Sequence, residues 1–217
     1  MRKTFDAELQ ELNYEMINMA AAAEDAIDTV TESLSSDAPD AAHEAMELTK
    51  TMDEMERDIE NHCFRLLLQQ QPVARDLRTV SAALKMVTDL QRIGDQCANI
   101  AELSLLWPGN VQKAQDLADI RSMSQKAAVM VKRSIFAYAN RDVDSAKEVI
   151  ALDDEVDELF QQVKKELVEL LVGNREEADR AIDLIIIAKY LERIADHAVN
   201  IAQWAIYCVT GELVAAN

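Results

Sequence analysis

The sequence predicts an all-α protein made of two tandem antiparallel three-helix bundles, and three observations support this fold class. The 217 residues include only 4 Gly and 3 Pro, so tight turns are rare. Ala, Leu, Glu, Met, Lys and Gln, all strong helix formers, dominate the chain. Finally, the chain breaks into six long segments, and one short signature recurs in both halves.

Helix breakers set the limits of the six segments. Segment 35–39 combines capping residues with Pro at the first helical position, and Pro72 separates the second helix from the third. Residues 140–142 and 173–174 have the same roles in the second half. The expected helices cover 5–34, 39–70, 73–105, 111–139, 143–172 and 176–210.

An internal duplication pairs the third helix with the sixth. The signature Arg-Ile-x-Asp, followed by Asn-Ile-Ala, ends at Ala101 and again at Ala202, an offset of 101. A weaker match pairs Asp53 with Asp157 at an offset of 104 on the second helix of each half. We therefore expect a first three-helix repeat over 1–107 and a second over 108–217, joined by a break at Trp107-Pro108.

A polar stripe accompanies the signature on each motif helix. At 100° per residue, this stripe lies about 170° from the apolar side formed by residues such as Leu90 and Ile93. It is predicted to face solvent or a partner, either as ordinary solvated surface or as a cation site, because carboxylates four residues apart repel each other. The stripe consists of Gln91, Asp95 and Asn99 in the first copy and Glu192, Asp196 and Asn200 in the second.

A second group of acids lies on the fifth helix. Asp153 and Asp157 are on the flank of its apolar stripe, with Asp53 as the counterpart of Asp157 on the second helix. If the neighbouring helix is the motif helix of the same half, the two sets of carboxylates can share a metal site. If it is not, they are acids interacting with a helix dipole. Oxygen ligands alone suit Mg, Mn or Fe, whereas zinc usually recruits His or Cys.

Several classes of function are disfavoured by composition. A formal charge of −18 repels nucleic acid and anionic membrane surfaces. The densest apolar run, 184–188, is too short to insert into a membrane, and the start of the chain has no apolar signal core. Cys63, Cys97 and Cys208 form no CxxC pair, which indicates reduced thiols in a cytoplasmic protein.

Enzymatic motifs are also missing from the sequence. No histidine has a Glu three residues before it, as an inward-facing di-iron site requires. The four glycines form no phosphate-binding loop, dinucleotide turn or nucleophile elbow. We therefore expect a protein that is not an enzyme.

The segment Gln71-Pro72-Val73-Ala74-Arg75-Asp76-Leu77-Arg78, together with the endings Arg-Ile-Gly-Asp and Arg-Ile-Ala-Asp, resembles the PhoU family over essentially the whole chain. The resemblance implies a six-helix protein, often a homodimer, that works beside a phosphate ABC transporter and a sensor histidine kinase. In that role it restrains phosphate uptake and phosphate-starvation signalling. We expect a non-catalytic adapter that docks the transporter's ATPase subunit and the kinase.

The resemblance also implies surface metal sites at Glu/Asp-x-x-x-Asp motifs. Glu192 and Asp196 fit that pattern, whereas Gln91 replaces the first acid in the other copy and Thr49 stands where Asp153 has its counterpart. The second half should therefore be the better metal binder, while the identity of the ion, Mg, Mn, Fe or Zn, stays open. The alternatives are a metal-storage or redox protein, an accessory protein of another phosphate permease, and a generic helical adapter.

Overall fold

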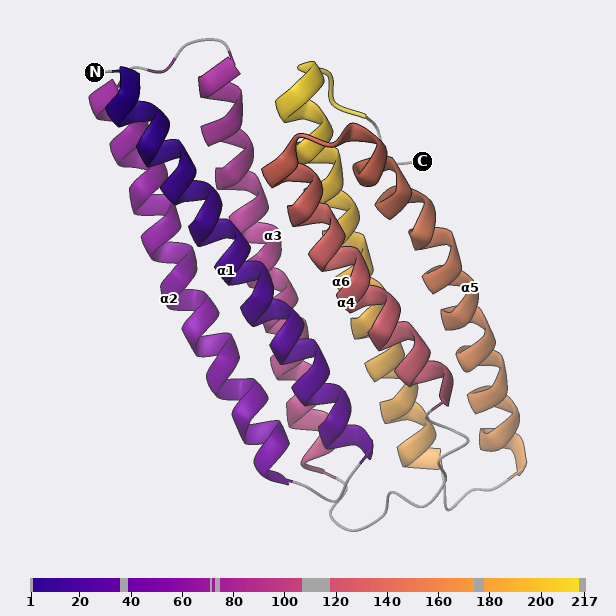
Figure 1. The fold of residues 1–217 in the computed structure, drawn as a ribbon. Coiled ribbons are helices and arrows are strands. Elements are labelled where there is room, and N and C mark those ends of the chain that lie inside the picture. Colours follow the sequence, from indigo (N-terminus) through magenta and orange to yellow (C-terminus); the bar gives the residue numbers. More distant parts are fainter. Residues whose placement is uncertain are drawn as a thin grey trace.

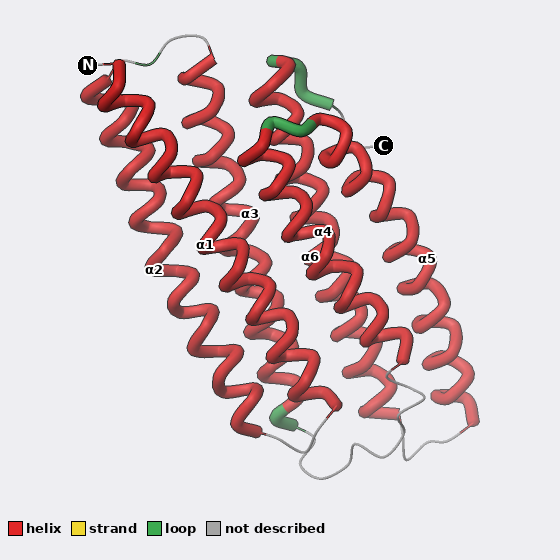
Figure 2. Tube along the Cα trace, viewed as in Figure 1, coloured by secondary structure: helices red, strands yellow, loops and turns green. Residues whose placement is uncertain are grey.

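A computed structural model describes residues 2–35, 39–70, 72, 75–106, 118–173 and 178–214. These residues form six long helices and no strand (Figure 2). None of the described helices has both the length and the apolar character needed to cross a membrane. The helices are α1 (Arg2–Ser35), α2 (Pro39–Gln70), α3 (Arg75–Ser104), α4 (Ala118–Asn140), α5 (Val143–Gly173) and α6 (Ala178–Thr210).

The six helices agree with the sequence prediction, and their ends differ from it by a few residues. The predicted starts at 73, 111 and 176 lie outside the described residues, and so does the predicted boundary between the repeats at 107 and 108. The agreement follows from the scarcity of Gly and Pro, because little in the sequence interrupts a helix once it has begun.

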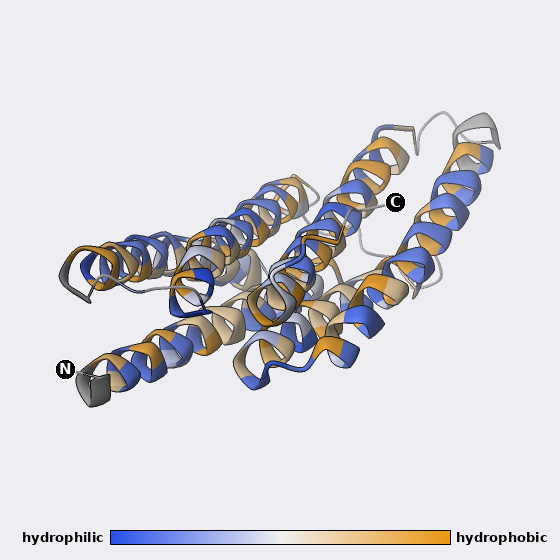
Figure 3. Ribbon diagram, turned by 90° about the horizontal axis from the view of Figure 1, so that it is seen from above, coloured by the Kyte–Doolittle hydropathy of each residue, from blue (hydrophilic) through white to orange (hydrophobic). Residues whose placement is uncertain are grey.

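Each half of the chain forms one three-helix bundle. Helices α1, α2 and α3 pack on one another, as do α4, α5 and α6. Figure 1 shows the two bundles lying side by side, with successive helices running in opposite directions. In the view from above in Figure 3, every helix carries both hydrophobic and hydrophilic residues along its length, and the buried apolar residues of the described helices form the core.

The two bundles are joined along their length by two helix pairs. Helix α3 packs on α6, and α1 packs on α4. Thr31 contacts Ser124, and Lys132 Nζ donates to Glu24 Oε1 at 2.9 Å, so α1 and α4 run antiparallel. Buried apolar side chains from both halves form a continuous core among the described residues. The bundles are therefore two repeats of one packed body.

The predicted break at 140–142 is a tight turn. Arg141 has a φ of 57°, a left-handed conformation that ends many helices. The Arg141 N–H donates to the Tyr138 carbonyl and the Asp142 N–H to the Ala137 carbonyl, which satisfies the last turn of α4. Asp142 then caps α5, and hydrogen bonds from the side chain and backbone of Ser145 lower the pKa of its carboxyl. This turn aligns α5 beside α4 and α6.

Candidate functional site

Acidic side chains from α5 and α6 lie close together on the second bundle. Among these carboxyl groups, Asp153 shows the effect of this proximity most clearly, because its pKa is raised to about 6. Burial is the largest cause, followed by repulsion from Asp196, Asp157, Asp154 and Glu192. The condition set in the sequence analysis is met, because α5 packs on α6, the motif helix of the same half; a metal site shared by the two helices stays a prediction. We call Asp153, Asp157, Glu192 and Asp196 the second-half cluster.

The other carboxylates of the second-half cluster also perturb one another. Although both residues are exposed overall, partial burial of their carboxyl groups, and then the charge of Glu192, raises the pKa of Asp157 and Asp196. The side chain of Glu192 is only 13% exposed, so its charge is poorly screened by water. Asp153 Oδ1 is buried and has no hydrogen-bond partner. A buried acceptor without a donor is costly, and a cation bound beside it would remove that cost.

The donor set suits a hard cation, although the side chains are not gathered around one point. Within the described part of the chain, no three His, Cys, Asp or Glu side chains are already arranged to hold a metal ion. The second-half cluster supplies carboxylate oxygens alone, which is the ligand chemistry of Mg²⁺ and Mn²⁺. The orphaned Asp153 oxygen gives such an ion a specific partner. The ligand chemistry therefore suits an oxygen-bound cation, although the described side chains are not arranged around one point.

A lysine that the sequence analysis missed lies at this cluster. Lys189 is one turn before Glu192 on α6 and forms an ion pair with its carboxylate. Its Nζ also lies 5.4 Å from the centroid of the Phe160 ring on α5, at cation–π distance. The Lys189 charge opposes the rise in pKa at Asp157 and Asp196. The i, i+3 spacing of Lys189 and Glu192 was the available signal in the sequence.

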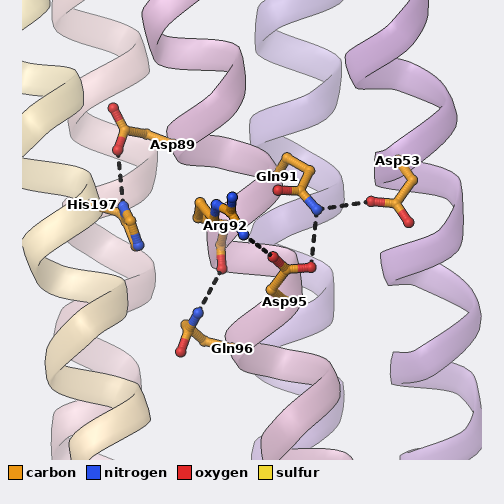
Figure 4. A network of polar contacts seen from close by, with 7 residues as sticks. All are labelled: Asp53, Asp89, Gln91, Arg92, Asp95, Gln96 and His197. Carbon is orange, nitrogen blue, oxygen red and sulfur yellow. Dashed lines mark hydrogen bonds and ion pairs between the residues drawn. The ribbon is translucent and has the colours of Figure 1, made fainter.

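The corresponding site in the first bundle is closed by hydrogen bonds (Figure 4). Gln91 Nε2 donates to Asp53 Oδ1 at 3.0 Å and to Asp95 Oδ1 at 2.9 Å, linking α3 to α2. Arg92 Nη1 donates to the other oxygen of Asp95 at 3.1 Å. Thr49 donates its hydroxyl to the Met46 carbonyl of its own helix. Gln91 stands where the other copy has an acid. Its amide thus lies between the two carboxylates and stabilises both by donating a hydrogen bond to each.

The predicted outward orientation of the polar stripe is corrected by these contacts. Gln91, Asp95 and Asn99 are half-buried, and Gln91 reaches across to α2. The prediction assumed one packed side per helix, whereas α3 packs against α1, α2 and α6. The flanks of a helix with three neighbours are partly covered. Neither motif Asp is sealed inside a bundle, because Asp95 is 39% exposed at its side chain and Asp196 is exposed.

Asn200 is turned away from the second-half cluster. Its Nδ2 donates to Asp89 Oδ1 at 3.2 Å, and His197 Nδ1 lies 2.9 Å from the same oxygen. Because Asp89 lies on α3, this contact joins the two bundles, with the His197 pair shown in Figure 4. The sequence analysis missed Asp89, whose counterpart at an offset of 101 is Tyr190. A metal-ligand role for Asn200 or Asn99 stays a prediction.

A shallow apolar groove follows the seam between α1 and α4. It encloses about 300 Å³. Ile17 and Phe136 are 41% and 55% exposed, and the Glu24–Lys132 ion pair lies at its edge. The groove is lined by Ile17, Ala20, Ala21, Glu24, Lys132, Ile135, Phe136, Ala139 and Asn140. Sequence alone could not reveal it, because it exists only where the two halves meet.

Comparison with known proteins shows matches over nearly the whole chain. The family model described as PhoU domain matches twice, at residues 16–104 and 120–205. A protein of Clostridium acetobutylicum named phosphate-specific transport system accessory protein PhoU homolog is 35% identical, covering 100% of this chain and 99% of its own length. A protein of the same name from Aquifex aeolicus is 38% identical, over 95% of this chain and 93% of its own.

Solved structures match the fold equally well. The crystal structure of PhoU from Pseudomonas aeruginosa superposes with a TM-score of 0.91 at 30% identity, covering 96% of this chain and 100% of that one. The phosphate transport system regulatory protein PhoU from Streptococcus pneumoniae gives a TM-score of 0.89 at 26% identity, over 97% and 99% of the two chains. Both matches extend over the two bundles.

Proposed function

The chain belongs to the PhoU family, and from this membership we propose that it is a non-catalytic accessory protein of a phosphate transport system. The observation that carries the proposal is the match, along the full length, to relatives named as phosphate-specific transport system accessory proteins. The name of the Streptococcus pneumoniae structure, a phosphate transport system regulatory protein, supports a regulatory role. The protein acts in the cytoplasm and restrains phosphate uptake and starvation signalling when phosphate is plentiful.

Regulation follows from binding, because a protein shifts a partner's conformational equilibrium only by preferring one of its states. We propose that the partners are the ATPase subunit of a phosphate ABC transporter and a sensor histidine kinase. The acidic surface, from a net charge of −18, favours partner faces that carry basic residues. Because salt screens the attraction between opposite charges, this binding should weaken as the salt concentration rises.

Pull-down of the purified full chain with the ATPase subunit and with the kinase of its host tests the adapter proposal. We expect specific binding that changes with phosphate or Mn²⁺ and decreases between low and high salt. The double variant Asp25→Lys and Glu32→Lys makes the surface of α1 less acidic. Comparing its binding with that of the wild type shows how much the acidic surface contributes. Absence of binding to either partner, with or without phosphate and Mn²⁺, would remove the proposal.

The second-half cluster is proposed as a divalent-cation site. Asp153, Asp157, Glu192 and Asp196 would supply the ligands, and the ion would neutralise carboxylates that now repel one another. The ion would also tie α5 to α6, stabilising one arrangement of the second bundle. The first-half residues Asp53, Gln91, Asp95 and Asn99 form the weaker site, because the Gln91 amide already occupies both carboxylates.

Equilibrium Mn²⁺ binding distinguishes the two halves. We expect Asp196→Asn to abolish binding, whereas the matched variant Asp95→Asn leaves it unchanged. Many tightly held iron atoms per chain would instead favour a storage or redox protein. A site that holds one or two ions per chain agrees with a regulatory role.

We also propose that the α1–α4 groove joins two copies of the chain in a homodimer. Helix α1 carries eight acidic and two basic residues, whereas α4 carries four basic and one acidic residue. A two-fold axis along the seam would place the acidic helix of each copy over the basic helix of the other. It would also bring Ile17 of each copy toward the apolar residues of α4, such as Phe136, in the other copy. The groove is therefore self-complementary in both charge and hydrophobicity.

A further inference from the structure

A second groove follows the seam between α4 and α5, which lie side by side in the second bundle (Figure 1). It encloses about 370 Å³. Its floor is apolar, because Val129 on α4 is 43% exposed and Leu152 on α5 packs partly against the core. The groove is lined by Ser122, Gln125, Lys126, Val129, Arg133 and Leu152. None of these residues lines the α1–α4 groove, so the two grooves can be occupied at the same time.

Two ion pairs bracket the apolar floor of the α4–α5 groove. Lys126 pairs with Glu155, and Arg133 Nη1 lies 3.5 Å from Glu148 Oε2. The two cations are seven residues apart on one face of α4, about 10.5 Å along the helix axis, with Val129 between them. Their side chains are 35% and 51% exposed, so a partner can reach both.

The charge of this groove contrasts with that of the whole chain. The net charge is −18, whereas the groove lining contains two cations and no acid. Such a lining attracts carboxylates, and the apolar floor favours an apolar side chain between them. A long acidic polymer such as nucleic acid would be repelled by the surrounding surface. A fitting ligand is therefore acidic over a short stretch only.

We propose that the α4–α5 groove binds an amphipathic helix of a partner protein, with two acidic residues seven positions apart and an apolar residue between them. That spacing matches the two turns of α4 from Lys126 to Arg133, and an amphipathic helix lying in a groove is a common mode of recognition. The inference rests on the adapter role proposed above and adds a second kind of contact to it. The acidic surface of the chain binds basic faces of a partner, whereas this groove binds a locally acidic helix.

Titration of the full chain with a helical peptide tests this docking. The probe is a fluorescein-labelled, stapled Ala-based helix with two Glu seven positions apart and Leu between them, and the control peptide has Gln in place of both Glu. Lys126→Gln and Arg133→Gln should each weaken binding of the acidic peptide about threefold. Lys132→Gln removes the same charge from the same helix, but Lys132 lines the α1–α4 groove, so affinity should be unchanged.

A gain of affinity separates docking from a defect in folding. Glu155→Gln releases Lys126 from its partner on α5, so this variant should bind the acidic peptide about twofold more tightly. NMR of the methyl groups locates the bound peptide. The signals of Val129 and Leu152 should shift during the titration, whereas those of Ile17 in the α1–α4 groove should not.

Several results would overturn the groove assignment: no binding of the acidic peptide, equal binding of the Gln control peptide, or equal affinity of Lys126→Gln and Lys132→Gln. Shifts at Ile17 without shifts at Val129 would overturn it too, because the helix would then occupy the α1–α4 groove. The pull-down described above tests the adapter role separately. A partner held equally by wild type and by the double variant Lys126→Gln and Arg133→Gln would reject the groove alone. Peptide binding without any captured partner would reject the adapter role alone.

Discussion

Replacing Asp153 with Asn is expected to stabilise the metal-free protein at neutral pH. Burial, together with the surrounding carboxylates, raises the pKa of Asp153 from 3.8 to about 6 in the folded protein. Ionised Asp153 therefore has a higher free energy in the folded state than in the unfolded chain. The Asn side chain has nearly the same shape, carries no charge and adds an N–H donor for neighbouring carboxylates, as Gln91 does in the first half.

The sign and size of this stabilisation follow from the difference between the pKa of Asp153 in the folded and unfolded states. Well below pH 3.8 the carboxyl is protonated in both states, so it costs nothing; the cost grows as the pH rises from 3.8 to about 6 and is complete above that range. The full shift from 3.8 to about 6 corresponds to about 3 kcal/mol at pH 7. Because Asp153 is only half-buried, solvent screening reduces this to about 1 kcal/mol.

Urea and thermal unfolding in EDTA between pH 4 and pH 8 measure this effect. At pH 7, Asp153→Asn should melt about 2–4 °C above wild type, and the difference should disappear near pH 4. Asp58→Asn, on an exposed part of α2, serves as the control and should show no such pH dependence. A variant that is less stable than wild type at pH 7, or a gain that persists unchanged at pH 4, would refute the reasoning.

Three further predictions concern other contacts. Gln91→Glu loses two hydrogen bonds and adds a third carboxylate beside Asp53 and Asp95, so the metal-free free energy of unfolding should fall by about 1–2 kcal/mol; unfolding with and without Mn²⁺ should show that the ion restores it. Phe136→Asp should convert a dimer to a monomer in light scattering without lowering the melting temperature, because the ring is 55% exposed. Asp89→Ala leaves His197 and Asn200 without their shared acceptor and should cost about 1–2 kcal/mol in urea unfolding, with a matched Asp58→Ala near zero.

The helices and their duplication could be predicted because both are local properties of the sequence. Few residues break a helix, so the limits of the six segments are marked by the few that do. The offset of 101 between the copies likewise needs no knowledge of packing. The sequence could predict the proximity of Asp153 to Glu192 and Asp196 only on the condition that the fifth helix packs on the sixth. A residue on the flank of a helix can face either of two neighbouring helices, and the sequence does not say which.

The remaining features depend on how the helices pack. Asp89 contacts His197 only because α3 of one bundle lies against α6 of the other, and nothing at its counterpart Tyr190 signals that contact. The orientation of the polar stripe was misjudged for the same reason, since α3 has neighbours on three sides. The sequence identified Gln91 as the departure from the acidic pattern, but its bond to Asp53 required the register between α2 and α3.

Locating a bound ion tests the difference between the two halves most directly. Anomalous scattering from crystals grown with Mn²⁺ should show a peak between α5 and α6, within coordination distance of Asp153 and Asp196, and no peak between Asp53 and Asp95. A peak at the first-half residues, or none in the second half at saturating Mn²⁺, would contradict the assignment.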